Sequence, residues 1–392
     1  MTSKKPQVVI AGIGQTKVGE LWDVSLRDLA VQAVMAARKD AGGLKPTAIY
    51  VGNTLAAAGS HQANLGALIA EYAGLIGAEG ITVEAADASG AAALRMAYTA
   101  VLSGLVDVAI AVGVEKFTDV IGSQFDSLTA QMLDTDYEAS AGLTPVSQAA
   151  LLLQRYMYDN NVPREALAAF PLIAHANAVN NPNAMFRKAI KLETYLRAGM
   201  IADPINLFDV APYADGAAAV LLTRADLLPP DMPNPLIEIV GASLIIDRLA
   251  IHDRKDPMAF TAASISAGNA MMQAGITLEE VDFFEYADIT TLHAILALEA
   301  IGAAPRGEGW RLGSNGCLAL DGKLPVATLG GFKARGHPLG ASGVYQVVEA
   351  VLQLRGQAGA SQVKDAHIGM VQCLGGPAST AVTHVLKKVV NR

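Results

Sequence analysis

The chain has few aromatic residues, little charge and only two cysteines. Aromatic side chains make up 5% of the 392 residues and hydrophobic residues 52%, so the core must consist of Ala, Val, Leu and Ile. Small apolar side chains favour closely packed helices and sheets. Cys317 and Cys373 are too few for a disulfide framework or a zinc cluster, and this cysteine usage fits a reducing, cytoplasmic setting.

Basic residues and long apolar runs are also scarce. The 29 Lys and Arg residues are outnumbered by 37 Asp and Glu residues, which gives a net charge of −8. This balance argues against a nucleic-acid surface, which needs a basic patch, but it allows a local basic pocket for a phosphorylated ligand. No apolar run has the length and freedom from charge and glycine that a membrane span needs. Residues 1–6 lead into a predicted strand and not into a secretory signal.

The most informative stretch is residues 330–343, which contains five glycines, His337 and Pro338 and leads into a predicted helix. Glycine permits positive φ and close approach of a ligand to the backbone. Proline holds the preceding histidine in extended geometry. An imidazole on a rigid loop before a helix is well placed to exchange a proton with a ligand. The alternative is a glycine-rich turn with an incidental histidine.

Alternation of apolar strands with helices predicts an α/β fold. Strands are expected near 7–14, 48–52, 81–86 and 107–115, with helices at 25–40, 64–73 and 91–102. Residues 116–201 differ in composition and predict an inserted helical and loop segment, which in compact domains usually carries function. Four prolines within residues 227–235 predict a linker. We therefore expect an N-terminal half (1–117 and 206–230), an inserted loop domain (118–205) and a C-terminal half (235–392).

The second half of the sequence repeats the first. The order Ala88-Ser89-Gly90, helix, Ser103-Gly104 and strand 107–115 corresponds to Ala341-Ser342-Gly343, helix, Gly356 and strand 366–374. This correspondence predicts two similar α/β halves that face each other. Ligand sites in such folds lie at the loops that leave the carboxyl ends of strands.

Four stretches resemble the thiolase superfamily, in particular the sterol-carrier-protein-2-type and archaeal thiolases. They are the Gly-His-Pro loop at 333–343, the Cys-x-Gly motif at 373–376, residues 209–220 and residues 252–254. The resemblance implies a five-layered αβαβα core and a loop domain near 118–205 that binds coenzyme A. It also implies a coenzyme A thioester as substrate or ligand, no covalently bound cofactor or metal, and a homodimer or dimer of dimers.

The departures from the family pattern concern the reactive groups. Asp87 stands where the family has its nucleophilic cysteine, and Ala287-Asp288, preceded by Tyr286, replaces a His-Asp or Asn-Glu pair. His337 and Cys373 remain. By resemblance, His337 would bind the thioester oxygen and Cys373 would act as acid or base. Gly336 and Gly375 would supply backbone groups to the same oxyanion site.

The chemistry of Asp87 leaves several roles open. A carboxylate is a weak nucleophile toward a thioester, it would form a high-energy anhydride, and its charge would repel a developing enolate. Asp87 could instead cap a helix N-terminus or act as a general base. Tyr286 is either a proton donor or acceptor or a buried aromatic residue, and Cys373 is either an acid or base or a small core residue. His293 either replaces the missing histidine or has no role in the site, and Cys317 is read as incidental.

Three functions fit this pattern. The first is carbon–carbon chemistry on an acyl-CoA without an acyl-cysteine, for example retro-aldol cleavage of a 3-hydroxyacyl-CoA. Thiolase-like retro-aldolases of this kind work with an OB-fold and zinc-ribbon partner protein, which the resemblance extends to this chain. The second is a thiolase or acyltransferase with altered active-site residues. The third is a non-catalytic subunit that binds acyl-CoA or lipid.

Overall fold

The computed structural model describes residues 6–389 and contains a nine-stranded mixed sheet in the order β3-β2-β4-β7-β1-β8-β11-β10-β9. The first five strands in this order come from the N-terminal half: β1 (Val8–Gln15), β2 (Ala48–Gly52), β3 (Glu79–Val83), β4 (Val108–Glu115) and β7 (Gly216–Arg224). The other four come from the C-terminal half: β8 (Ile237–Ile246), β9 (Phe283–Glu285), β10 (Ile368–Gly375) and β11 (Thr380–Lys388).

The two halves share one pattern of strand pairing. In the N-terminal half, β2 and β4 are parallel, and β4–β7 and β7–β1 are antiparallel. In the C-terminal half, β9 and β10 are parallel, and β10–β11 and β11–β8 are antiparallel. Only two residue pairs, Val9 with Glu238 and Ile10 with Ile237, join β1 to β8 and so connect the halves edge to edge. The repeat predicted from the sequence is therefore confirmed.

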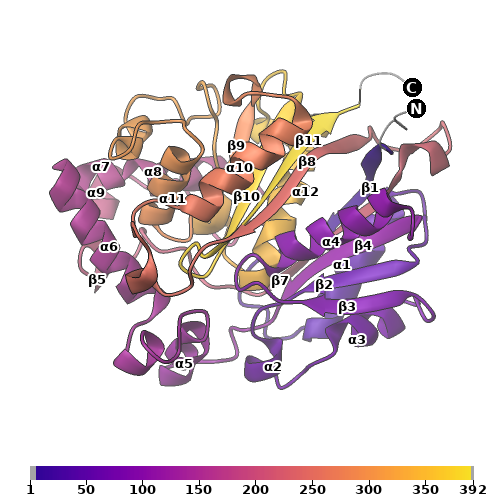
Figure 1. The fold of residues 1–392 in the computed structure, drawn as a ribbon, viewed down its shortest axis with the longest axis horizontal. Coiled ribbons are helices and arrows are strands. Elements are labelled where there is room, and N and C mark those ends of the chain that lie inside the picture. The colour runs from indigo at the N-terminus through magenta and orange to yellow at the C-terminus, as the bar shows by residue number, and fades with distance from the viewer. Residues whose placement is uncertain (1–5, 390–392) are drawn as a thin grey trace.

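Helices form three layers around these strands (Figure 1). Helices α1 (Leu26–Asp40) and α3 (Leu65–Tyr72) cover the outer face of the N-terminal strands, and α10 (Thr261–Ala274) packs on the outer face of β8 and β11. Helices α4 (Ser89–Ser103) and α12 (Ser342–Arg355) lie between the halves and contact strands of both. This arrangement gives the expected five layers, and it explains why almost every residue of α12 is buried.

The two central helices approach each other closely at their N-termini. A Cβ atom on Gly90 would lie 2.5 Å from the carbonyl oxygen of Gly340, and a Cβ atom on Gly343 would lie 2.7 Å from the Cβ atom of Ala91. Any larger residue would push the helices apart. The small-residue motifs at the starts of α4 and α12 thus set the distance between the halves.

An inserted segment lies between β4 and β7, and Figure 1 shows it in magenta on the left of the molecule. It contains α5 (Ser123–Ala130), α6 (Pro145–Asn160), α7 (Arg164–Leu167), α8 (Ala169–Ala178), α9 (Leu192–Leu196), β5 (Met200–Ala202) and β6 (Ile205–Asn206). Helix α6 begins at a capping box in which Thr144 and Ser147 bond each other's backbone amides, with Pro145 in the first turn. Helix α11 (Thr291–Ala300) packs against both α6 and α8, so the segment is attached to the C-terminal half.

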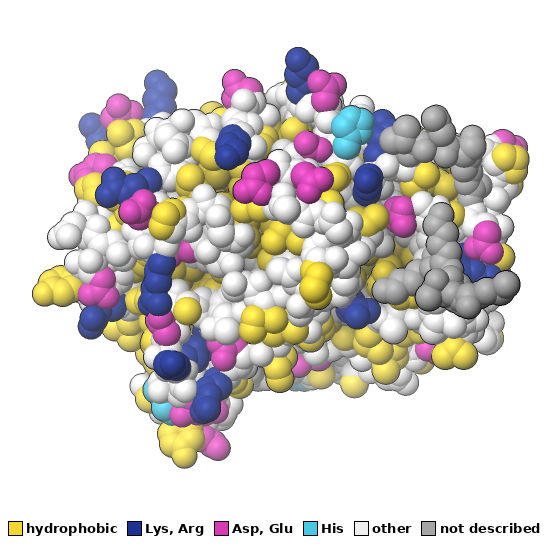
Figure 2. All heavy atoms as spheres, turned by 45° about the horizontal axis from the view of Figure 1, so that its top comes forward, with side chains coloured by type: hydrophobic (Ala, Val, Ile, Leu, Met, Phe, Trp, Pro, Cys, Tyr) yellow, Lys and Arg dark blue, Asp and Glu magenta, His cyan; other side chains and the backbone are white. Residues whose placement is uncertain are grey.

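Charged side chains of both signs are interspersed with apolar ones on the face shown in Figure 2, so no single-sign patch dominates this face. Among residues 6–389, no helix has both the length and the apolar character needed to cross a bilayer.

His384 on β11 is a buried histidine that has no role in the site described below. Neither ring nitrogen has a hydrogen-bond partner among the described residues, and burial, with a further contribution from Arg95, lowers the pKa of His384 to about 3. Below pH ~6.5 the unfolded chain binds a proton at this position and the folded chain does not. The free energy of unfolding therefore decreases as the pH is lowered below this value.

We predict that native protein loses about 2 kcal/mol more stability between pH 7.5 and pH 5 than an H384L variant does. Urea unfolding of both proteins at the two pH values measures this difference. Only the difference is diagnostic, because other buried groups titrate equally in both proteins. Identical pH dependence in the two proteins would show that His384 is protonated in the folded state.

Candidate active site

Asp87 lies in a tight turn between β3 and α4. The preceding residue, Ala86, has a φ of 49°, which is uncommon for a residue with a side chain. Two hydroxyls hold this turn, since Thr54 Oγ1 donates to the Ala86 carbonyl at 2.8 Å and Ser89 Oγ accepts from Ala85 N at 2.9 Å. The N-cap position of α4 is Ala88, and no side chain caps the helix. The hypothesis that Asp87 is an N-cap is therefore wrong.

The carboxylate of Asp87 is directed toward the C-terminal half. Its Oδ1 lies 2.9 Å from His337 Nε2, and its Oδ2 accepts the Gly376 N–H at 3.0 Å. The main-chain oxygen of Asp87 accepts the Cys373 thiol at 3.4 Å. All of these groups are buried. The structure thus brings together three of the residues selected from the sequence, Asp87, His337 and Cys373.

His337 is held on every side. Its Nδ1 lies 2.8 Å from Ser342 Oγ, so both ring nitrogens have partners. The ring stacks on Phe332 with centroids 4.7 Å apart, and Tyr213 lies 5.7 Å away on another side. The His337 amide donates to the Pro212 carbonyl at 2.8 Å. The imidazole is directed at Asp87, and both of its nitrogens are engaged by protein side chains.

Cys373 and Tyr286 are poorly suited to ionise. Burial and the negative charge of Asp87 raise the pKa of the Cys373 thiol well above its usual range, so it is a thiol donor and not a thiolate. Burial also raises the pKa of Tyr286, whose ring lies 5.9 Å from that of Phe284. No hydrogen bond within the described chain joins Tyr286 to Asp87 or His337. Cys317 lies elsewhere, in a surface pocket with Leu278.

The amide that contacts Asp87 is that of Gly376, which follows the predicted Gly375. The Gly336 amide donates to the Phe332 carbonyl at 3.1 Å and is thus used within its own turn. Gly375 has a steric role, since a Cβ atom there would lie 2.3 Å from the Ala85 carbonyl oxygen. The close approach of β10 to the Asp87 turn therefore requires glycine at position 375.

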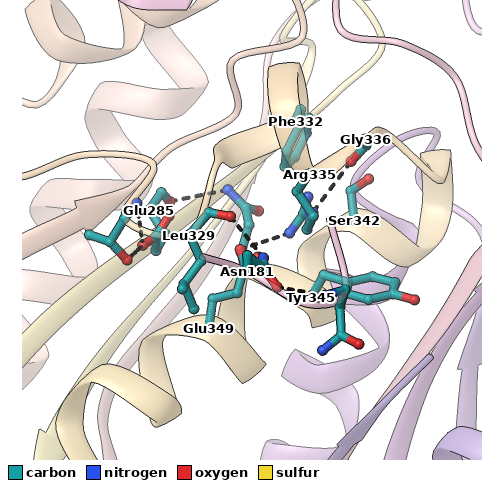
Figure 3. A network of polar contacts seen from close by, with 12 residues as sticks. Asn181, Glu285, Leu329, Phe332, Arg335, Gly336, Ser342, Tyr345 and Glu349 are labelled. Atoms are coloured by element: carbon teal, nitrogen blue, oxygen red, sulfur yellow. Dashed lines mark hydrogen bonds and ion pairs between the residues drawn. The ribbon is translucent and has the colours of Figure 1, made fainter. Parts of the chain in front are cut away.

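A buried ion pair supports the His337 loop from below (Figure 3). The Arg335 guanidinium donates to Glu349 Oε2 at 2.9 Å and, through Nε, to the Gly336 carbonyl at 3.3 Å. The guanidinium lies over the rings of Phe332 and Tyr345, 5.2 Å from each centroid. These contacts fix the residues on both sides of Gly336 and so fix the direction of the loop.

Further carboxylates lie near this ion pair. The Asp288 carboxylate accepts the Phe332 amide at 2.6 Å and so holds the turn that begins the loop. Glu285 accepts the Thr328 amide at 3.0 Å. Burial raises the pKa of Glu285 to about 7 and that of Glu349 to about 8, although Arg335 acts in the opposite direction on both. Arg335 therefore offsets the negative charge of several buried acids.

The inserted segment is bonded directly to the His337 loop. Met185 N donates to the Arg335 carbonyl at 2.9 Å, and Asn181 Nδ2 donates to the Leu329 carbonyl at 2.8 Å. Lys333 reaches back from the loop and donates to the Asp209 carbonyl at 2.5 Å. Movement of the inserted segment would consequently displace the loop that carries His337.

A cavity of about 660 Å³ lies between the inserted segment and this loop. Its walls are mostly apolar, with Phe125, Phe186, Phe208 and Ile201 among them, and Lys333 and His175 supply polar groups. Val146 and Tyr213 also line a second, narrow cavity of about 20 Å³ that reaches Asp87, Gly376 and His293. The larger cavity therefore adjoins the space in front of Asp87.

Matches to known proteins agree with this geometry. Residues 8–226 match the model for the thiolase N-terminal domain, and residues 244–388 match the model for the thiolase C-terminal-domain-like family. The chain belongs to the thiolase family. The predicted superfamily and fold are thereby confirmed.

Two similar thiolase-family relatives cover nearly the whole chain. One is the acetyl-CoA acetyltransferase of Methanothermobacter thermautotrophicus, 42% identical over 97% of this chain and 99% of the relative. The other is the benzoylsuccinyl-CoA thiolase subunit BbsB of Thauera aromatica, 31% identical over 94% of this chain and 95% of the relative. Among solved structures, the Ltp2-ChsH2(DUF35) aldolase has a TM-score of 0.83 at 23% identity, with 100% of both chains covered, which indicates a shared fold.

Sequence reasoning gave no role to Tyr213 and left the role of His293 open between a replacement for the missing histidine and no role in the site. Tyr213 lines both cavities and packs near His337; it lies in the family-like stretch 209–220 but was given no role there. His293 lines the narrow cavity with Asp87. The signal for His293 was its position in the first turn of a helix after a strand, where ligand sites of α/β folds gather. Within the described chain, no cluster of three or more His, Cys, Asp or Glu residues could hold a metal ion.

We predict that R335M loses about 3–5 kcal/mol of stability because it removes a cation that offsets the charge of several buried acids. E349Q should lose far less, since the raised pKa of Glu349 means that a neutral side chain already competes with the carboxylate near neutral pH. Urea unfolding at pH 7 measures both variants. Equal losses would contradict the idea that Arg335 serves the whole group of acids.

Proposed function

We propose that this protein acts on coenzyme A thioesters of acyl groups and catalyses cleavage or formation of a carbon–carbon bond without an acyl-cysteine, in the manner of a retro-aldolase. The observation that carries the proposal is the Asp87 carboxylate, which is fixed by His337 and Gly376 in front of the narrow cavity. A fixed carboxylate is a good general base and a poor acyl carrier. The cysteine beside it, Cys373, is held as a thiol by burial and by Asp87.

The proposed reaction begins with a 3-hydroxyacyl-CoA. Asp87 takes the proton of the 3-hydroxyl group, and the electrons of that O–H bond form a carbonyl at C3. The C2–C3 bond breaks, and its electron pair passes into the thioester as an enolate. Asp87 then returns this proton to C2, which regenerates its carboxylate and yields a shortened acyl-CoA and an aldehyde or ketone. Atoms and electrons balance, and the step needs no oxidant or reductant.

The cavity of about 660 Å³ is proposed to hold the pantetheine arm and part of the acyl group. Its size lies within the range of small-molecule sites, and its apolar walls suit a slender, mostly uncharged chain. Exposed basic residues follow Phe186 at the cavity wall, namely Arg187, Lys188, Lys191 and Arg197. They would supply positive charge for the phosphates of coenzyme A.

One other function, and work within a larger assembly, have specific support. The name of the 42% identical relative, acetyl-CoA acetyltransferase, favours an acyltransferase with an altered site. The Thauera relative is named as a subunit, and the aldolase structure is named for two components, Ltp2 and ChsH2(DUF35), which favours work within a larger assembly. We propose a partner protein of the OB-fold and zinc-ribbon kind, in addition to a second copy of this chain.

We predict that native protein incubated with acetyl-CoA gives no stable acyl adduct, whereas D87C becomes acylated because a thiolate can form near His337. Intact-mass spectrometry measures acylation of both proteins. A C317S background removes the half-exposed cysteine as a source of labelling. An adduct on native protein that survives in the C317S background would refute the non-covalent reaction.

A second prediction concerns the cavity. V146F should weaken coenzyme A binding by about tenfold, because Val146 lines the junction of the two cavities and a larger ring would narrow it. Calorimetric titration with coenzyme A measures the affinity. L151F is the matched control, since Leu151 lies on the same helix, α6, with 59% of its surface exposed. Equal affinities in the two variants would place the coenzyme A site elsewhere.

A further inference from the structure

His293 is a buried histidine whose ring is anchored on one side. It lies in the first turn of α11, where the Thr290 N-cap hydroxyl is 2.8 Å from His293 Nδ1. Only 7% of the residue is exposed, and its ring lies 5.5 Å from that of Phe260. The capping residue of the helix thus also sets the orientation of the imidazole.

The other nitrogen, Nε2, has no hydrogen-bond partner within residues 6–389. His293 lines the narrow cavity together with Asp87, Gly376 and Tyr213. His337, by contrast, has both nitrogens engaged by Asp87 and Ser342. Of the two histidines near Asp87, His293 is therefore the one with a nitrogen available to a ligand.

The charge state of His293 follows from its surroundings. Burial is the largest influence and lowers its pKa to about 4, with Asp87 acting in the opposite direction. The imidazole is therefore neutral at physiological pH. Thr290 can donate its hydroxyl proton to Nδ1, and this tautomer leaves an N–H on Nε2. A buried neutral imidazole of this kind is an effective hydrogen-bond donor to a developing oxyanion.

We propose that His293 is a catalytic residue whose Nε2–H donates a hydrogen bond to the thioester oxygen of the bound acyl-CoA and stabilises the enolate. This assignment rests on the proposed function and deepens it. It separates the charges of the reaction, since Asp87 takes the hydroxyl proton while negative charge grows on the oxygen that faces His293. His337 cannot supply this hydrogen bond because its Nε2 is bonded to Asp87. His293 on α11 supplies it instead.

The test is exchange of the C2 protons of acetyl-CoA, butyryl-CoA and octanoyl-CoA in deuterated water, followed by mass spectrometry. This exchange reports enolate formation whether or not a carbon–carbon bond is cleaved. Asparagine at position 293 keeps a polar group near Nδ1 and Thr290 but has nothing at the Nε2 position, whereas glutamine reaches that position. We expect H293N to slow exchange on the order of 100-fold and H293Q to retain most of it.

The control variant is H367L, in which an exposed histidine is replaced far from the cavity without an expected change in exchange. A purely structural role for His293 predicts the reverse order, with H293N tolerated better than H293Q. A second pair, T290V and T290S, tests the tautomer without touching the imidazole, because only T290V removes the hydroxyl that bonds Nδ1. T290V should slow exchange, and T290S, which keeps the hydroxyl, should not.

The outcomes separate this proposal from the proposed function. If native protein exchanges the C2 protons and H293N does so equally fast, the role of His293 is wrong and the proposed function stands. If T290V and T290S exchange alike, the tautomer assigned to His293 is overturned. If native protein binds these thioesters but exchanges none of their C2 protons, enolate chemistry fails, and the role of His293 fails with it.

Discussion

The contact between Asp87 and His337 is the constraint on which the site depends, because it joins the two halves of the molecule. Asp87 follows β3 of the N-terminal half, and His337 and Gly376 belong to the C-terminal half. A buried carboxylate is costly unless it is paired and hydrogen-bonded. Its partners come from the other half, so the site exists only once the halves have docked. The close contacts of Gly90 and Gly343 between α4 and α12 make that docking distance possible.

The same requirement for compensation explains the polar layer beneath the His337 loop. Glu285, Asp288 and Glu349 are all buried, and burial raises the pKa of each of them. Arg335 acts against this rise in pKa on all three, and the buried Lys333 also does so on Asp288. Such a group contributes less to net stability than its number of contacts implies, because each charge has lost its water. Its value lies in specificity. A loop held by directional bonds to Arg335 and Asp288 has one well-defined conformation, and His337 is presented in one orientation.

A feature of the fold or the site could be predicted from the sequence when the residues that cause it are neighbours in the sequence. The glycines and Pro338 impose backbone geometry on their own neighbours, so the His337 loop was predicted correctly as a rigid feature, and the repeated small-residue motifs predicted the two halves. The cap hypothesis for Asp87 failed because the positive φ of Ala86 and the bonds of Thr54 and Ser89 turn the side chain away from α4.

Tyr213 was not predicted from the sequence, and the role of His293 was left open, for a related reason. The two residues are 80 positions apart in the sequence. They meet only when the inserted segment packs on α11 of the C-terminal half. The family-like stretch 209–220 gives no role to Tyr213, and a histidine on an apolar helix is usually a core residue. What identifies His293 is its free nitrogen beside Asp87, and a free nitrogen is a property of the folded hydrogen-bond network alone.

The two histidines together suggest how this fold could serve a reaction without an acyl-cysteine. The Asp87 carboxylate engages two hydrogen-bond donors, His337 Nε2 and the Gly376 amide, so neither is available to a ligand oxygen. A site in this state needs another donor to stabilise an enolate, and that donor must be neutral so that it does not neutralise the base. His293 meets both conditions, because Thr290 orients it and burial keeps it uncharged. In the proposed reaction, Asp87 serves as the base, and a histidine on a different helix completes the site.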